Sequence, residues 1–269
     1  MVDMNTRYFD QEQPIVVGLL GNAGAGKTST ADAIVPQSLI ASEGVVRWDH
    51  LVLATPLYEM VTTKRMTTGE IKGKERQLYA LHDLLVDLFG GSPLYGAPDY
   101  DDLVDLVRYI QGVPVPLEGK PRTFMQSVAT LCREYDPDCF ANRVRKTVMK
   151  QNLHYQEQDL FYAALVSDVR FINEVSMIKK QPNGVVIKLD ASPEVRAARI
   201  EKRDGKAMTA EELSHESEKL DIPEEMIDLH IDTDPIGIQD VATAVKKALF
   251  DIFPGFQDLT VTEEELTNA

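Results

Sequence analysis

The sequence has few cysteines, no long apolar segment and no leader-like start. Its 269 residues include only Cys132 and Cys139, which are too few for a disulfide framework and lack metal-ligand partners at the usual spacing. The longest uninterrupted apolar run, residues 160–166, is too short to span a bilayer. The first residues are polar and acidic, whereas a signal peptide would be basic and then apolar. These absences predict a cytoplasmic protein with reduced cysteines and no membrane partner.

Positive charge is also in deficit, and it is unevenly distributed. The chain has 28 Lys and Arg against 43 Asp and Glu, a formal net charge of −15, which argues against a general nucleic-acid or membrane-surface binder. Three segments nevertheless carry net charges of +3, +4 and +3, at residues 64–76, 120–150 and 196–206. Each alone is typical of a solvated helix face. Together they allow a local basic site for a small anion.

Short apolar runs alternate with helix-like segments along much of the chain. Residues 15–20 and 160–166 are continuous apolar runs, as expected of strands buried on both faces of a parallel sheet. Further strands are expected at residues 45–54, 185–189 and 229–231, a turn at Asn183-Gly184, and helices at residues 27–41, from Pro56, at 172–180, from Pro193 and at 241–252. This alternation predicts a three-layer α/β fold with a mainly parallel sheet flanked by helices.

The middle of the chain breaks this alternation. Residues 57–157 show several helical patterns joined by Gly- and Pro-rich segments, and no clear strand. We expect one domain over residues 1–253, with a core at 14–56 and 158–253 and a helical insertion at 57–157. Residues 254–269 are expected to form an acidic tail that frays.

A glycine-rich motif follows the first expected strand directly. Residues 21–28 read Gly-Asn-Ala-Gly-Ala-Gly-Lys-Thr and match G-x-x-x-x-G-K-[ST], immediately before an expected helix. Such a loop turns successive N–H groups toward a β-phosphate at a helix N-terminus, whose dipole favours anions. The expected ATP-binding residues are Gly21, Asn22, Ala23, Gly24, Ala25, Gly26, Lys27, Thr28 and Ser29. A Gly-rich turn without a ligand is the alternative, but the strand–loop–helix context favours phosphate binding. In this motif Lys27 bridges the β- and γ-phosphates and the Thr28 hydroxyl holds Mg²⁺.

Two classes of P-loop protein are disfavoured by missing motifs. A switch GTPase needs an Asn-Lys-x-Asp motif, and no Asn in this chain is followed by Lys. A motor or repair ATPase usually ends a buried strand with Asp-Glu, whereas residues 167–170 read Ser-Asp-Val-Arg. The absence of that water-activating acid favours transfer to a bound acceptor over hydrolysis.

An arginine stripe offers the cations that phosphoryl transfer needs. Arg196, Arg199 and Arg203 have the spacing of one helix face, and Gly205 then breaks the helical pattern. A solvated face is the ordinary interpretation. The preceding Ser-Pro-Glu and the expected strand before it resemble the start of the lid in nucleotide kinases, here expected over residues 196–222. Arg199 and Arg203 would then stabilise transition-state charge.

Four further segments follow the phosphate loop in a fixed order. They are residues 53–59 (Leu-Ala-Thr-Pro-Leu-Tyr-Glu), 122–130 (Arg-Thr-Phe-Met-Gln-Ser-Val-Ala-Thr), 168–174 (Asp-Val-Arg-Phe-Ile-Asn-Glu) and 215–218 (His-Glu-Ser-Glu). Together with the loop they resemble the deoxynucleoside monophosphate kinases encoded by bacteriophages, within the nucleoside monophosphate kinase superfamily. The similar segments lie between residues 15 and 235, with 64–118 not clearly matched. Ala129 stands where that family tends to have Gly.

The resemblance implies a function and a set of site residues. It implies ATP-dependent, Mg²⁺-assisted phosphorylation of a deoxynucleoside 5′-monophosphate to the diphosphate, with a homodimer in the host cytoplasm as a further implication. The residues it implies for acceptor binding are Arg122, Gln126, Arg133, Asp136, Arg170, His215 and Glu218. The catalytic residues implied are Lys27, Asp168, Arg170, Arg199 and Arg203. Asp168 holds Mg²⁺ through water or orients the acceptor, with capping of the following helix as the alternative.

Two other functions stay open at this point. One is a different small-molecule P-loop kinase, acting on dephospho-coenzyme A or on a modified base within DNA. The acidic net charge disfavours the DNA version, and no stable nucleic-acid binding is expected. The other is a nucleotide-binding regulator, against which the missing Asn-Lys-x-Asp and the arginine stripe both argue.

Overall fold

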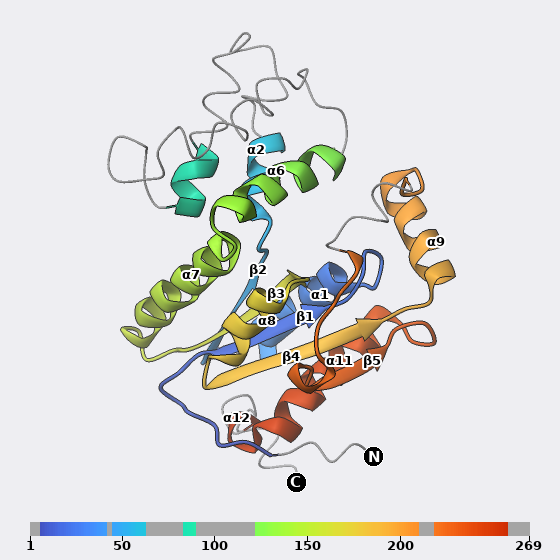
Figure 1. The fold of residues 1–269 in the computed structure, drawn as a ribbon. Coiled ribbons are helices and arrows are strands. Elements are labelled where there is room, and N and C mark those ends of the chain that lie inside the picture. Colours follow the sequence, from blue (N-terminus) through green and yellow to red (C-terminus); the bar gives the residue numbers. More distant parts are fainter. Residues whose placement is uncertain (1–5, 42–44, 63–82, 90–121, 210–217, 258–269) are drawn as a thin grey trace. The chain divides into compact units, whose positions relative to one another are not determined.

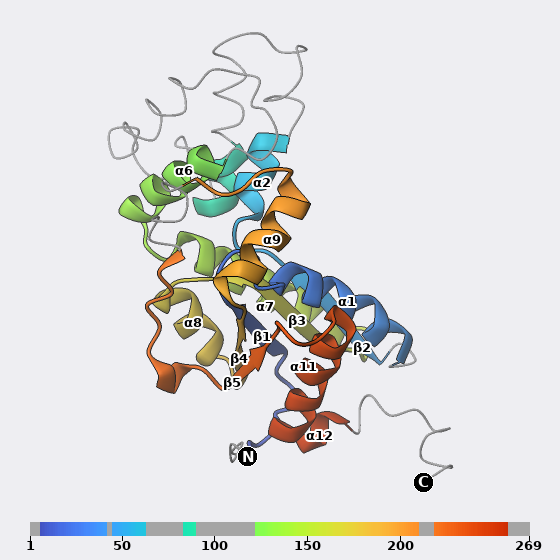
Figure 2. The same cartoon turned by 90° about the vertical axis from the view of Figure 1, so that its right-hand side faces the viewer.

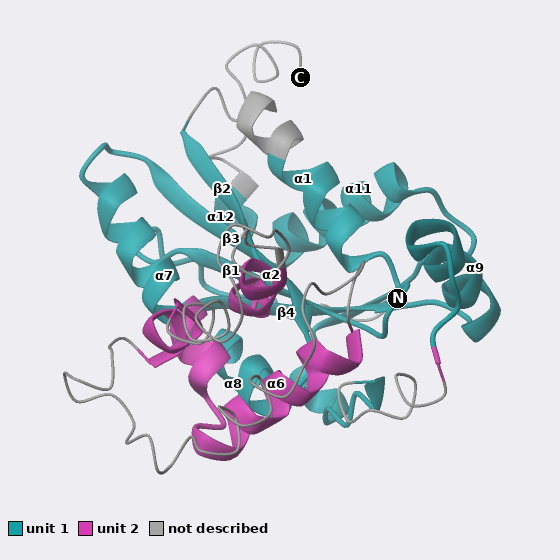
Figure 3. Ribbon diagram, turned by 90° about the horizontal axis from the view of Figure 1, so that it is seen from above, with its two compact units in different colours: residues 1–52, 145–208, 216–269 teal, residues 53–144, 209–215 magenta. Residues whose placement is uncertain are grey.

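The chain forms two compact units in the computed structural model, which describes residues 6–41, 45–62, 83–89, 122–209 and 218–257 (Figure 1). Unit 1 comprises Met1–Val52, Arg145–Met208 and Glu216–Ala269, and unit 2 comprises Leu53–Val144 and Thr209–His215 (Figure 3). Among the described helices, none is both long and apolar enough to cross a bilayer.

Unit 1 is built on a parallel sheet of five strands. The strands are β1 (Ile15–Leu20), β2 (Val46–Leu51), β3 (Phe161–Val169), β4 (Asn183–Asp190) and β5 (Leu229–Asp232). Their spatial order is β2-β3-β1-β4-β5, and every neighbouring pair is parallel. All six residues of the central strand β1 are buried, which explains its continuous apolar sequence.

Helices cover both faces of this sheet, so the expected three-layer α/β fold is confirmed. On one face α1 (Lys27–Ala41) packs against α11 (Ile238–Ile252), and on the other face α8 (Ile172–Lys179) packs on β1 and β4 (Figure 2). Residues at helical spacing on α11, from Val241 to Ile252, are buried against the sheet side. The remaining elements of unit 1 are α9 (Pro193–Asp204), η3 (Glu224–Met226), α12 (Pro254–Gln257) and the second half of α7 (Cys139–Gln156).

The expected turn at Asn183-Gly184 overlaps the start of β4: the Gly184 N–H donates to the Gln181 carbonyl at 3.0 Å and closes a turn over residues 181–184, while the strand already begins at Asn183. The Asn183 side chain is fully buried, and its Nδ2 donates to the carbonyls of Asp10, at 2.7 Å, and Gln13, at 2.8 Å. Its Oδ1 accepts the Asp10 N–H at 3.0 Å. These bonds to the N-terminal segment satisfy the amide side chain inside the sheet, so it does not need the local backbone contacts that make Asn a turn residue.

The expected fraying also fails for residues 254–257, which form α12. The reason is Phe256, whose side chain is 1% exposed and whose ring centroid lies 5.7 Å from that of Phe9 and 6.0 Å from that of Trp48. Burying an aromatic ring stabilises this last turn against the core. Residues 258–269 lie outside the described part of the chain.

The described residues of unit 2 form helices and no strand, in line with the helical character expected of 57–157. They are α2 (Thr55–Thr62), a helix at 83–89, α6 (Arg122–Tyr135) and the start of α7. Arg143 Nε lies 2.6 Å from Asp87 Oδ2, and Phe89 meets Tyr135 edge-to-face with centroids 5.3 Å apart. Residues 145–157 belong instead to unit 1. Cys132 and Cys139 are both buried and form no disulfide, and burial raises the pKa of Cys132.

Candidate active site

The glycine-rich motif forms a tight loop between the end of β1 and the start of α1. Ala25 N–H donates to the Asn22 carbonyl at 3.2 Å, and Thr30 N–H donates to the Gly26 carbonyl at 2.8 Å. Gly24 and Gly26 have φ of 83° and 97°, a left-handed conformation that favours glycine. The backbone therefore has the wrapped form that the motif predicts for a phosphate-binding loop.

The end of β3 lies beside this loop at the carboxyl edge of the sheet. Leu20 pairs with Val169, so Gly21 and Arg170 leave the sheet from neighbouring positions. Gly18 pairs with Val166, and therefore two residues of β3, at 167–168, face the single position 19 of β1. Such a bulge is typical of sites where a side chain is redirected next to an active centre. The second of these two residues is Asp168, which therefore lies near the carboxyl end of β3.

Lys27 is buried against its own loop. Its side-chain ammonium donates to the Gly21 carbonyl at 2.5 Å and to the Asn22 carbonyl at 2.9 Å, and the residue is 7% exposed. Burial is the largest cause that lowers the pKa of Lys27 well below its ordinary value, and the positive charge of Arg170 lowers it further.

Charged residues that the sequence predicts for catalysis gather around this ammonium. The carboxylates of Glu218 and Asp168 raise the pKa of Lys27, while Arg203, like Arg170, lowers it. The Lys27 ammonium thus interacts electrostatically with side chains from three other parts of unit 1: the end of β3, the helix α9 and the segment after residue 217.

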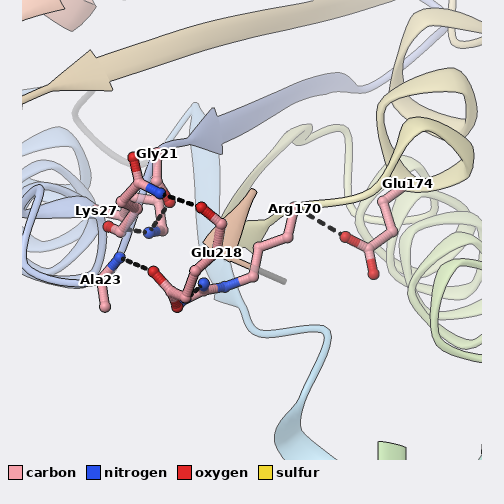
Figure 4. Close-up of polar contacts among 7 residues, drawn as sticks. Gly21, Ala23, Lys27, Arg170, Glu174 and Glu218 are labelled. Atoms are coloured by element: carbon pink, nitrogen blue, oxygen red, sulfur yellow. Dashed lines mark hydrogen bonds and ion pairs between the residues drawn. The ribbon is translucent and has the colours of Figure 1, made fainter. Parts of the chain in front are cut away.

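Glu218 binds directly to the phosphate loop (Figure 4). Its Oε2 accepts the Ala23 N–H at 3.0 Å, and its Oε1 pairs with Arg170 Nη1. Its carbonyl accepts a hydrogen bond from Asn22 Nδ2 at 2.7 Å. Burial alone would raise the pKa of Glu218, but Arg170, the Ala23 N–H and Lys27 together outweigh it and lower the pKa. The loop therefore holds a negatively charged group in the protein without nucleotide.

Arg170 is positioned by a buried carboxylate that the sequence analysis missed. Glu174 is 1% exposed, and its Oε2 accepts the N–H of Arg170 at 2.8 Å (Figure 4). The same oxygen accepts the N–H of Phe171 at 3.1 Å. The signal that was available is an acid three residues after Phe171, the spacing of a helix N-terminal capping residue.

The arginine stripe lies on α9 as expected, but its members have different surroundings. Arg199 donates to the Thr233 hydroxyl at 2.9 Å and to the Thr233 carbonyl at 2.8 Å, and its Nη1 lies 3.4 Å from the Gly24 carbonyl. Arg203 Nε is 2.7 Å from Asp204 Oδ1, and its side chain is 51% exposed. Arg199 thus connects α9 to the phosphate loop and to the end of β5, and Arg203 is the more accessible cation. Gly205, with φ 71°, ends the helix as its C-cap.

A second hydrogen-bonded network, which sequence reasoning missed, includes Ser167, the residue before Asp168. His50 Nδ1 is 2.9 Å from Asp32 Oδ1, and His50 Nε2 is 2.6 Å from Ser167 Oγ. This network links α1, β2 and β3 at the bulge. Ser167 is buried, so it supports the bulge from inside and is not an accessible nucleophile.

The expected acceptor residues of α6 lie in unit 2. Arg122, Gln126 and Arg133 are partly exposed, whereas Phe124, Met125, Val128, Ala129 and Cys132 are buried. The Arg133 guanidinium carbon lies 4.6 Å from the centroid of the Phe140 ring, and Asp136 Oδ1 accepts the Asp138 N–H at 2.9 Å. Asp136 therefore stabilises the turn into α7. A shared site with the phosphate loop stays a prediction, and His215 lies outside the described residues.

The residues expected to hold Mg²⁺ fit that ion by type. Thr28 is exposed at the start of α1, and Asp168 is half-buried at the end of β3. A hydroxyl and a carboxylate are oxygen ligands, and Mg²⁺ in nucleotide sites usually has few protein ligands beside water and phosphate oxygens. In the described parts of the chain, no group of three or more His, Cys, Asp and Glu residues has the arrangement of a metal cluster.

Comparisons with known proteins reveal only distant similarity. No protein-family model matches the chain, and no curated protein matches it. A gluconokinase from Sinorhizobium meliloti 1021 aligns with 13% identity over 91% of this chain and 96% of its own, at a TM-score of 0.42. A sugar kinase from Janibacter sp. aligns with 15% identity over 93% and 99%, at 0.41. A shikimate kinase from Acinetobacter baumannii, in complex with shikimate, aligns with 14% identity over 89% and 94%, at 0.40. Scores this low carry no argument about activity.

Proposed function

We propose that the protein is a kinase that transfers the γ-phosphoryl group of ATP to a deoxynucleoside 5′-monophosphate. The observation that carries this proposal is the anion-binding arrangement of unit 1. A glycine-rich loop binds a carboxylate through the Ala23 N–H, and Lys27 and Arg170 lie beside that carboxylate. A phosphate group has the same charge sign and accepts the same hydrogen bonds.

The chain's own residues have clear tasks in such a transfer. The reaction needs little covalent chemistry from the protein, so catalysis rests on positioning and on neutralising charge. Lys27 would exchange its two carbonyl acceptors for phosphate oxygens. Arg170 would hold the transferred group, and Glu174 fixes the backbone from which Arg170 extends. Arg203 is the exposed arginine of the stripe on α9, while Arg199 holds that helix against the loop.

A bound Mg²⁺ would neutralise part of the negative charge of the nucleotide phosphates. Thr28 at the start of α1 and Asp168 at the end of β3 are the residues that would hold it. The sequence resemblance supports the deoxynucleoside monophosphate as acceptor, through Arg122, Gln126 and Arg133 on α6. Cationic and amide side chains on one helix suit a phosphate and a base or sugar edge.

The test is ADP production that depends on an acceptor. The protein is incubated with ATP, Mg²⁺ and each of the common deoxynucleoside monophosphates in turn, and ADP is measured with and without the acceptor. We expect ADP above background only when an acceptor is present. No acceptor-dependent ADP with any member of the panel would contradict the proposal.

Lys27→Ala tests whether the loop performs the transfer. Removing a cation that stabilises transition-state charge is expected to lower the rate by about a hundredfold or more. Lys150→Ala is the matched control, because Lys150 is an exposed lysine on α7. Circular dichroism should show both variants folded. An undiminished rate in Lys27→Ala would contradict the assigned mechanism.

A further inference from the structure

We propose that Glu218 is an internal competitor for the phosphate loop: its carboxylate occupies the loop in the free protein, and a nucleotide phosphate must displace it. This inference rests on the proposed function only in taking a nucleotide phosphate as the ligand of the loop. It assigns Glu218 a role different from the acceptor binding that the sequence resemblance implies.

The first support is that the contact excludes a second anion. A backbone N–H has a single proton, and the Ala23 N–H donates it to Glu218 Oε2 at 3.0 Å. The Arg170 guanidinium is also engaged by the same carboxylate, through Oε1. A phosphate that takes the Ala23 N–H must first break its hydrogen bond to Glu218. A phosphate that approaches Arg170 would share the guanidinium with a like charge.

The second support is that Glu218 is held in the charged form. Its side chain is only 7% exposed, yet the neighbouring cations and the Ala23 N–H lower its pKa, so it is ionised at neutral pH. A protonated acid would compete weakly, whereas a carboxylate competes with full charge. The hydrogen bond from Asn22 Nδ2 to the Glu218 carbonyl attaches the backbone of Glu218 to the loop as well.

The third support is the state of the loop's own lysine. The Lys27 ammonium donates to the carbonyls of Gly21 and Asn22 and is buried, although the Glu218 carboxylate lies close enough to affect its pKa. The Ala23 N–H and the Lys27 ammonium thus both have partners within the chain. A nucleotide phosphate that uses them exchanges these internal partners for its own oxygens.

The experiment compares the dissociation constant of Mg²⁺–ADP for three full-length proteins by isothermal titration calorimetry. Glu218→Gln keeps the size of the side chain and removes its charge. We expect it to bind ADP more tightly than the unchanged protein, with a dissociation constant about tenfold lower, because the like charge is gone and Arg170 loses its ion pair with Glu218. Glu225→Gln, an exposed glutamate a short distance along the chain, is the matched control and should bind like the unchanged protein.

Three results have distinct meanings. Equal or weaker ADP binding by Glu218→Gln, with Glu225→Gln unchanged, would overturn the inference and favour a direct binding role for Glu218. No ADP binding by any of the three proteins would contradict the proposed function and with it the ligand assumed here. If Glu218→Gln does not fold, Glu218→Asp takes its place, because a carboxylate one methylene shorter should lose its reach to Ala23 and also tighten ADP binding.

Discussion

Gly24→Ala tests the packing of the phosphate loop against α9. A Cβ atom built on Gly24 would lie 2.7 Å from the carbonyl oxygen of Arg196 and 3.0 Å from its Cα. Both atoms belong to the backbone of a capped helix, so neither can move aside by a rotamer change. The substitution therefore requires the loop or the first turn of α9 to shift.

Gly26→Ala supplies the matched control. The two glycines have similar φ, 83° and 97°, and a Cβ on Gly26 would meet nothing within 4 Å. Both variants incur the left-handed backbone cost of about 1–2 kcal/mol. Both also gain the same small stabilisation from a less flexible unfolded chain. Only Gly24→Ala adds an overpacking cost, of about 1–3 kcal/mol.

These magnitudes translate into a measurable difference in thermal unfolding. The backbone cost and the unfolded-state gain are common to both variants, so only the overpacking cost separates them. At about 3 °C per kcal/mol for a chain of this size, Gly24→Ala should have a Tm about 3–9 °C below that of Gly26→Ala. Circular dichroism at 222 nm follows the unfolding, with both proteins free of nucleotide. Equal losses in the two variants would refute the close approach of the loop to Arg196.

Two further predictions concern stability. Gly184→Ala should cost more than about 3 kcal/mol, because its Cβ would lie 1.9 Å from the Ile178 carbonyl oxygen, an atom of the backbone. Gly205→Ala has open space around its Cβ and should cost only the left-handed backbone penalty of about 1–2 kcal/mol, so equal thermal losses in the two variants would contradict the contact. Because the pKa of Glu218 is lowered in the folded protein, its stabilisation is complete above the ordinary carboxyl pKa and is lost as the pH falls through the lowered value. The Tm of the unchanged protein should thus exceed that of Glu218→Gln at neutral pH and converge with it in acid, and a constant difference would contradict the pairing with Arg170.

The strands, helices and phosphate loop were predictable because their signals are local. A continuous apolar run such as residues 15–20 indicates a buried strand wherever it occurs, and the expected helix from Pro193 is confirmed with a Ser192 N-cap. The glycine spacing of the loop likewise predicts its backbone form. Such features depend on neighbours within a few residues.

The features that the sequence did not predict depend on contacts between distant residues. Asn183 begins a strand because the N-terminal segment satisfies its side chain, and residues 254–257 are helical because Phe256 packs on Phe9 and Trp48. The contact of Glu218 with Ala23 spans 195 positions of the chain. No periodicity or motif links those two positions, so the carboxylate in the loop emerges only from the folded structure.

Phosphoryl transfer from the loop of unit 1 to a nucleotide acceptor can be followed with a labelled γ-phosphoryl group. ATP labelled at the γ-phosphorus is incubated with the protein, Mg²⁺ and a deoxynucleoside monophosphate, and the products are separated. We expect the label in the deoxynucleoside diphosphate, in proportion to the ADP formed. Label that stays in ATP, or that appears only as inorganic phosphate, would contradict the transfer.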